Sequence, residues 1–172
     1  MRFDSTVPLD QIDWRLLEAL QENARLTFAE LGRQLELSPP AVAERVRRLE
    51  VLGVITGYRA QVDPARLGLP LEAVIRIQAD SANECQTMGD RVSKEPEVLH
   101  CWRVTGSDSH VLHLAVRSVE HLDDALSRVM PHSGGTVTGV VLNTPVPRRT
   151  ITRELAEGTS QPVRPSRVAV RT

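Results

Sequence analysis

Apolar residues in the first third of the chain recur at helical spacing in three short runs. The first run predicts a helix with one apolar stripe, formed by Ile12, Leu16, Leu17 and Leu20. Thr27 and Glu30 have the spacing of a capping box and predict that a second, short helix begins at residue 28. Ser38, followed by two prolines, predicts the start of a third helix, which Gly53 ends.

After Gly53 the apolar positions alternate instead. Residues 54–62 are predicted to form a small β-hairpin around Gly57, as in a winged helix-turn-helix. Later segments predict four strands separated by two capped helices; these strands cover residues 71–79, 98–105, 110–117 and 136–143. The order βαββαβ is that of a ferredoxin-like domain, and the fold class is therefore α+β. Such a sheet carries helices on one face only, so a second copy of the chain is the simplest cover for the other.

These patterns divide the chain into four parts. Residues 1–66 form the helix-turn-helix unit, 67–70 a linker and 71–150 the sheet domain. Residues 151–172 are rich in arginine and proline and are expected to be a flexible tail.

Composition narrows the class of protein. The 172 residues are 41% hydrophobic and 25% charged, which is typical of a globular protein and excludes collagen and wholesale disorder. No run approaches the roughly 20 apolar residues of a membrane helix. Two cysteines and the lack of an export signal lead us to expect a cytoplasmic protein with reduced thiols. The net charge of −1 does not indicate nucleic acid, so a DNA-binding interpretation depends on local clusters.

One such cluster lies on the third predicted helix. In a helix-turn-helix the N-terminal part of this helix faces base edges in the major groove. Arginine pairs with phosphate and makes bidentate contacts to guanine, and a helix N-terminus attracts phosphate. The candidate DNA-binding residues are Ser38, Pro39, Pro40, Glu44, Arg45, Arg47 and Arg48. The alternative is a packed three-helix unit whose arginines form a solvated face.

The segment LDQIDWRLLEALQENARLTFAELGRQLELSPPAVAERVRRLEVLGVITGYRAQVD resembles the Lrp/AsnC, or feast/famine, transcriptional regulators. The second half resembles the C-terminal regulatory domain of that family, so the resemblance covers roughly residues 9–150. It implies a DNA-binding regulator that forms homodimers through its sheets, often assembles into octamers, and responds to an amino acid or a related metabolite. No cofactor or metal is implied.

The resemblance also implies an effector site, near the loop between the two central strands and the start of the last strand. The matching residues are Gly106, Asp108, Ser109, Thr136 and Thr138. Asp108 can accept from an α-ammonium group, and loop N–H groups can bind a carboxylate. This chain departs from the family twice: two prolines stand where a polar base-reading residue is usual, and the loop lacks the family's tyrosines.

Two alternatives come from other classes. One is an architectural DNA-binding protein with little sequence preference, which the two prolines favour. The other is a small metabolite-handling enzyme, since the serines and histidines of residues 107–113 resemble a hydrolase set. His110 and His113 are three apart in a predicted strand and so point to opposite faces. No catalytic residues are assigned, and an enzyme is not expected.

Overall fold

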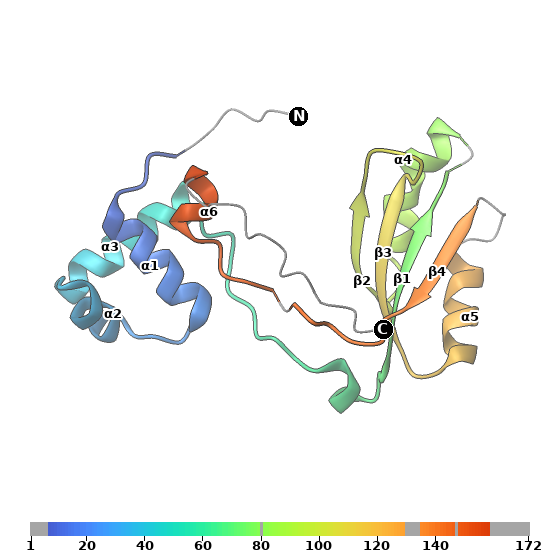
Figure 1. The fold of residues 1–172 in the computed structure, drawn as a ribbon, viewed down its shortest axis with the longest axis horizontal. Coiled ribbons are helices and arrows are strands. Elements are labelled where there is room, and N and C mark those ends of the chain that lie inside the picture. Colours follow the sequence, from blue (N-terminus) through green and yellow to red (C-terminus); the bar gives the residue numbers. More distant parts are fainter. Residues whose placement is uncertain (1–6, 80, 130–134, 147, 159–172) are drawn as a thin grey trace, which may run out of the picture. The chain divides into compact units, whose positions relative to one another are not determined.

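The computed structural model describes residues 7–79, 81–129, 135–146 and 148–158 of the chain. These residues belong to two compact units (Figure 1). The first unit holds the chain up to Ala60 together with the segment from Val146, and the second spans Gln61–Pro145. One is helical and the other is built on a sheet, so each is described by itself. Within the described ranges no helix has the length and apolarity to cross a bilayer.

The described part of the helical unit has four helices: α1 (Gln11–Glu22), α2 (Phe28–Leu35), α3 (Pro39–Val51) and the short α6 (Arg153–Glu157). Both α1 and α2 begin at a capping residue, and for α2 this confirms the predicted start. Asp10 Oδ1 accepts from the Asp13 N–H at 2.8 Å, and Thr27 Oγ1 accepts from the Glu30 N–H at 3.2 Å. Both caps are reciprocal capping boxes. The core of the unit consists of Leu16, Leu17, Leu31, Leu35, Val42, Val46 and Leu49.

The turn between α2 and α3 brings two backbone segments into close contact. The Leu37 N–H donates to the Gly32 carbonyl at 2.9 Å. A Cβ at Gly32 would lie 2.6 Å from the Leu37 carbonyl oxygen, so a side chain there would force the backbone apart. Glu36 makes the reversal with a φ of 58°, in the left-handed region. Glycine at position 32 therefore sets how tightly α3 follows α2.

Residues 54–62 do not form the predicted hairpin, and the described chain has no wing. The structure contains no strand there. The N–H groups of Val54 and Ile55 instead donate to the Leu49 carbonyl at 2.9 and 3.1 Å, and both side chains pack against the helical core. Apolar residues that looked like strand positions are used to close the end of α3. An isolated two-stranded hairpin is marginal by itself, so this packing prevails.

The segment predicted as a flexible tail is ordered through residue 158. The side-chain amide of Gln21 bonds both backbone groups of Ile151, accepting from its N–H at 2.9 Å and donating to its carbonyl at 3.1 Å. Thr152 then caps α6 by accepting from the Leu155 N–H at 3.4 Å. The prediction is thus wrong for residues 151–158, because a side chain of α1 satisfies the backbone there. Residues 159–172 lie outside the described part of the chain.

The second unit has the predicted βαββαβ order: β1 (Leu71–Ile77), α4 (Ala82–Val92), β2 (Val98–Arg103), β3 (His110–Val116), α5 (Val119–Val129) and β4 (Thr136–Val140). A 3₁₀ turn, η1 (Pro64–Leu67), precedes β1. The strands lie in the order β2-β3-β1-β4, and all neighbours are antiparallel. The ferredoxin-like topology is therefore confirmed, with strands shorter than predicted.

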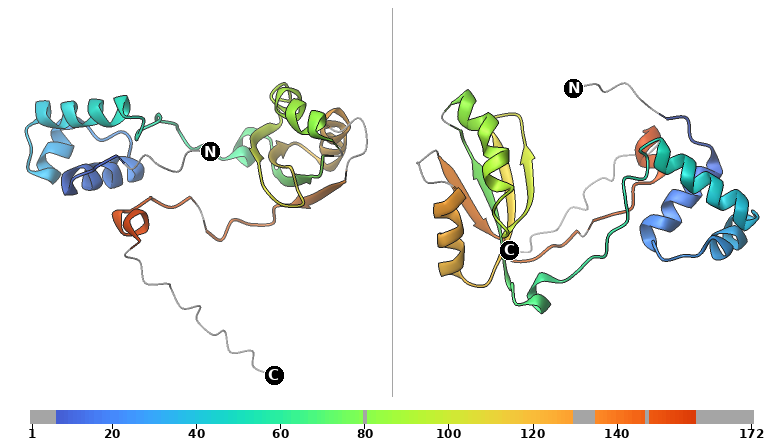
Figure 2. Two further views of the ribbon diagram at one scale, coloured as in Figure 1. Left: turned by 90° about the horizontal axis from the view of Figure 1, so that it is seen from above. Right: turned by 180° about the vertical axis from the view of Figure 1, so that it is seen from behind.

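Both long helices of this unit cover the same face of the sheet (Figure 2). Ala73, Ile75 and Ile77 alternate along β1 and are fully buried beneath them. The opposite face has no helix over it. There His113 Nε2 lies 2.7 Å from Glu72 Oε2.

Candidate nucleic-acid interface and ligand site

The first turn of α3 is exposed, as a DNA-reading helix requires. Ser38 caps it by accepting from the Ala41 N–H at 3.4 Å. Pro39 and Pro40 occupy the first two helical positions and are both exposed. A serine oxygen that accepts this bond still has its own proton to donate to a phosphate. The turn therefore presents one hydroxyl and two apolar rings to its surroundings.

Arg45 and Arg48 point to acids of α1 rather than away from the unit. Arg45 Nη1 lies 2.7 Å from Asp10 Oδ2 and 2.8 Å from Asp13 Oδ1. Arg48 Nη2 donates to the other oxygen of Asp13. Asp13 is fully buried, so its charge is compensated by two guanidinium groups at once. These contacts join α1 to α3 across more than thirty residues of sequence.

The charges of this cluster stabilise one another. The Asp13 N–H and then the Arg45 guanidinium hold the pKa of the Asp10 carboxyl below its ordinary value. In turn, hydrogen bonds first to Asp10 and then to Asp13 raise the pKa of Arg45. Arg45 therefore orients α3, and its charge is largely neutralised within the unit.

Arg47 is held differently from Arg45. Its Nη2 lies 2.8 Å from Glu44 Oε1, one turn earlier on α3, and both side chains are about two-thirds exposed. Arg47 lowers the pKa of Glu44 through this pair. An exposed ion pair contributes little to the free energy of unfolding, so either side chain can readily exchange its partner. Of the three clustered arginines, Arg47 is the one that can leave its partner for a phosphate at small cost.

The predicted effector residues meet at one end of the sheet but on two different faces. Ile77, the last residue of β1, pairs with His110 on one side and with Thr136 on the other. Thr136 and Thr138 pair with Ile77 and Ile75 and so point to the side of the sheet that carries the helices. Both threonines are exposed.

Asp108 belongs to the opposite face, where Oδ2 lies 3.8 Å from Arg76 Nη1. Gly106 takes a φ of +117° in the same loop. Ser109 is part of the framework: its hydroxyl donates to the Ile77 carbonyl at 3.0 Å and accepts from the Ala79 N–H at 3.1 Å. Within one protomer these residues therefore do not enclose a single pocket.

Comparison with known proteins agrees with this architecture. The AsnC-type helix-turn-helix domain matches residues 9–50, and the Lrp/AsnC ligand binding domain matches residues 72–151. The chain belongs to the Lrp/AsnC family. It is 35% identical to the Bacillus subtilis transcriptional regulator LrpC over 135 residues, which are 78% of this chain and 92% of LrpC.

Solved structures of Lrp/AsnC proteins superpose on most of the chain. LrpC of B. subtilis gives a TM-score of 0.76 at 33% identity, over 83% of this chain and 100% of that one. The Neisseria meningitidis regulator NMB0573, solved as an L-Met complex, gives 0.77 at 29% identity, over 84% and 96%. The protein is accordingly an HTH-type transcriptional regulator of the Lrp/AsnC family with a ligand-binding domain.

Two further arginines of the helical unit, which the sequence pattern did not indicate, can contact phosphates. Arg25 and Arg59 are exposed, and neither guanidinium forms a hydrogen bond or ion pair with any described residue. Both lie in irregular segments, where helical periodicity gives no signal. They are candidates for phosphate contacts because, unlike Arg45 and Arg48, they have no internal acid to leave.

Replacing the buried carboxylate should destabilise the helical unit. Asp13→Ala leaves Arg45 and Arg48 without their shared partner, and we expect a loss of about 3 kcal/mol in the free energy of unfolding. Urea unfolding followed by circular dichroism measures this loss. The matched control is Glu30→Ala, which removes the equivalent capping-box carboxylate of α2 but no inter-helix ion pair. If both variants unfolded at the same urea concentration, the ion pairs would not be what joins α1 to α3.

Proposed function

We propose that this regulator binds double-stranded operator DNA with the first turn of α3 in the major groove. The observation that carries the proposal is the exposure of Ser38, Pro39 and Pro40 at the start of a helix held in place by Asp13. A recognition helix contacts bases with its N-terminal residues, so these positions and Glu44 face the base edges.

The contacts within that interface differ in kind. Ser38 and Arg47 donate to phosphates, which fixes the register without reading sequence. The proline rings offer apolar surface to thymine methyl groups, a contact that discriminates base pairs in the major groove. Arg45 and Arg48 act mainly by positioning α3. Sequence preference then depends on the apolar contacts and on the deformability of the DNA.

We infer that a second copy of the chain covers the bare face of the sheet. His100 and Trp102 stack there with ring centroids 5.2 Å apart, and Trp102 is 48% exposed. Trp102 pairs with Val111, whose side chain points away from the helices. Exposed aromatic side chains are enriched at the centres of protein–protein interfaces, where a partner buries them. The stacked rings lie on the same face as the Glu72–His113 pair. The homodimer is the unit that we expect to assemble further into octamers.

The β2–β3 loop is the proposed amino-acid site. NMB0573, a relative of similar fold, is described as a complex with L-Met. In this chain Asp108 and Arg76 are 3.8 Å apart, and Arg76 is half exposed, so the pair is loose. An amino acid offers an ammonium group for Asp108 and a carboxylate for Arg76. Gly106, Ser109, Thr136 and Thr138 surround the same end of the sheet, and a partner copy would complete the enclosure.

The DNA proposal is tested by fluorescence anisotropy with DNA from upstream of the protein's own gene and a scrambled duplex. Arg47→Ala should weaken binding to both duplexes and lower the slope of log affinity against log salt by about 1 for each bound protomer, because each protomer loses one phosphate contact. The control Arg66→Ala lies in η1 of the other unit and should bind like the wild type. Unchanged affinity of Arg47→Ala would contradict the interface, and equal wild-type affinity for both duplexes would indicate an architectural role.

The dimer proposal is tested by light scattering coupled to size-exclusion chromatography. Trp102→Glu places a charge at the centre of the bare face and should shift the chain to monomers. Val119→Glu is the matched control, since Val119 is 64% exposed on α5, on the helical side of the sheet. A Trp102→Glu protein that keeps the wild-type mass would show that this face is not the interface.

The amino-acid proposal is tested by the response of DNA affinity to a pool of amino acids. Asp108→Asn removes the charge that would hold the ammonium group. About tenfold more amino acid should then be needed to change the DNA affinity, while DNA binding without amino acids is kept. Asp90→Asn, on α4, is the control. A full response in Asp108→Asn would exclude the loop as the amino-acid site.

A further inference from the structure

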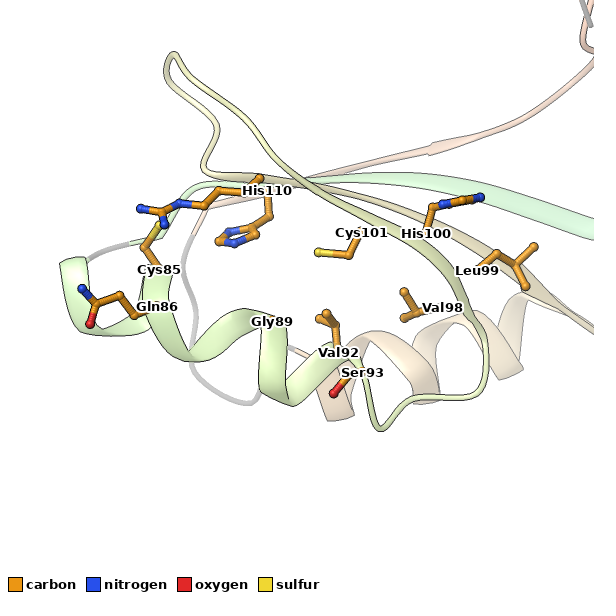
Figure 3. A pocket seen from close by; sticks show the side chains of 11 residues that line it. Cys85, Gln86, Gly89, Val92, Ser93, Val98, Leu99, His100, Cys101 and His110 are labelled. Atoms are coloured by element: carbon orange, nitrogen blue, oxygen red, sulfur yellow. The ribbon is translucent and has the colours of Figure 1, made fainter. Parts of the chain in front are cut away.

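A cavity of about 430 Å³ lies between α4 and the edge strand β2, on the helical side of the sheet (Figure 3). This volume falls within the range of small-molecule sites. The cavity is separate from the loop site proposed above, because Gly106, Asp108, Thr136 and Thr138 are not among its lining residues.

One wall of the cavity is a face of α4 on which one position, Gly89, has no side chain. Cys85, Gly89 and Val92 follow one another along this face at helical spacing. A Cβ at Gly89 would meet no atom within 4 Å, so no neighbour requires glycine there. Glycine inside a helix is destabilising relative to alanine. Here the missing side chain leaves the cavity open at its middle.

The polar end of the cavity is positively charged. Arg103 lines it and forms no hydrogen bond or ion pair with any described residue. Arg103 pairs across the strands with His110, which lines the same end and is only 3% exposed. Among the residues that the structure describes, no aspartate or glutamate lines the cavity. A ligand with a carboxylate would therefore give Arg103 its missing partner, whereas an ammonium group would find no counter-charge.

The proton on His110 is fixed by its neighbour. Burial, and then the charge of Arg103, lowers the pKa of His110, so the ring is neutral near pH 7. Its Nδ1 lies 3.1 Å from Ser109 Oγ. The single hydroxyl proton of Ser109 is already donated to the Ile77 carbonyl. With the hydroxyl proton placed in that way, Nδ1 donates to Ser109 Oγ, and Nε2 is left with a lone pair that accepts.

Nothing in the described chain donates to that lone pair, and the ring lies against the cavity (Figure 3). A neutral donor on the ligand, such as a hydroxyl group, would satisfy it. An ammonium group beside Arg103 would be repelled, and a keto oxygen has no proton to give.

The other end of the cavity is apolar. Val92, Val98 and Leu99 line it, with Val92 2% exposed. Cys101 lies between the two ends, and burial raises the pKa of its thiol, so the sulfur stays uncharged. An aliphatic side chain suits these walls.

We propose that this cavity binds a small aliphatic 2-hydroxy carboxylate. Arg103 pairs with the carboxylate, His110 Nε2 accepts from the 2-hydroxyl group, and the alkyl chain packs against Val92 and Val98. This second ligand site goes beyond the DNA and amino-acid functions proposed above and depends on neither.

Three probes with one carbon skeleton test the proposal by calorimetric titration of the full-length protein. They are 2-hydroxy-4-methylpentanoate, 4-methyl-2-oxopentanoate and leucine, which differ only at the second carbon. The hydroxy acid should bind in the cavity. The other two should bind there at least about tenfold more weakly, since the oxo group has no proton for Nε2 and the ammonium group of leucine is repelled by Arg103. No heat from the hydroxy acid, or an equal affinity for the oxo acid, would overturn the proposal.

Two variants locate the ligand. Arg103→Gln should lower the affinity for the hydroxy acid by about tenfold or more, because the charged partner of the carboxylate is lost. Gly89→Leu should abolish binding by filling the cavity, while leucine favours the helix over glycine and keeps α4 folded. Circular dichroism checks that fold. Arg117→Gln, an exposed arginine past the other end of β3, is the control and should bind normally.

Wild-type affinity in both Arg103→Gln and Gly89→Leu would place the ligand elsewhere and contradict the proposal. Gly89→Leu does not touch Asp108, so an amino-acid response of DNA binding that survives in it belongs to the loop site. DNA affinity without any ligand is measured on the same proteins. The failure of one proposal is thereby distinguishable from the failure of the others.

Discussion

The buried carboxylate of Asp13 is the constraint on which the DNA-reading half of the molecule depends. A fully buried charge is costly unless it is paired, and two arginines of α3 are the pairs available. The requirement is met only when α3 crosses α1 at one place, so the ion pairs specify geometry more than they add stability. They also remove Arg45 and Arg48 from the charge available to DNA. Although the sequence of α3 has a dense basic cluster, its first turn presents a serine hydroxyl and two proline rings. Within the cluster, Arg47 is the arginine that can exchange its partner for a phosphate.

The second constraint is the one-sided sheet. Both helices pack on the face of Ala73, Ile75 and Ile77, and they leave the face with Trp102 uncovered within the described chain. Both proposed ligand sites lie away from the centre of the face that a partner sheet is proposed to cover. One is the end of the sheet near Asp108 and the other is the cavity beside Gly89. A ligand at either place influences DNA binding only if it favours one arrangement of the assembled protein over another.

Much of this fold is predictable from local sequence because it is specified locally. Thr27 with Glu30 and Ser38 before two prolines mark helix starts that the structure confirms. The pairing of Asp13 with Arg48 joins residues 35 positions apart, and periodicity carries no information about it. The hairpin over residues 54–62 did not form for a related reason, since Val54 and Ile55 pack against the helical core instead of pairing with residues after Gly57. The cavity beside Gly89 was not foreseen either, because an unfilled space arises only from packing between distant segments.

The central claim is that Asp13 and the arginines of α3 act as one coupled unit, and a double-mutant cycle tests it most directly. The free energy of unfolding is measured for the wild type, Asp13→Ala, Arg48→Ala and the double variant. The account predicts that the double variant is less destabilised than the sum of the single variants, with a coupling of about 1.5 kcal/mol or more. Additive effects would contradict it, because they would mean that the arginine contributes independently of the buried carboxylate.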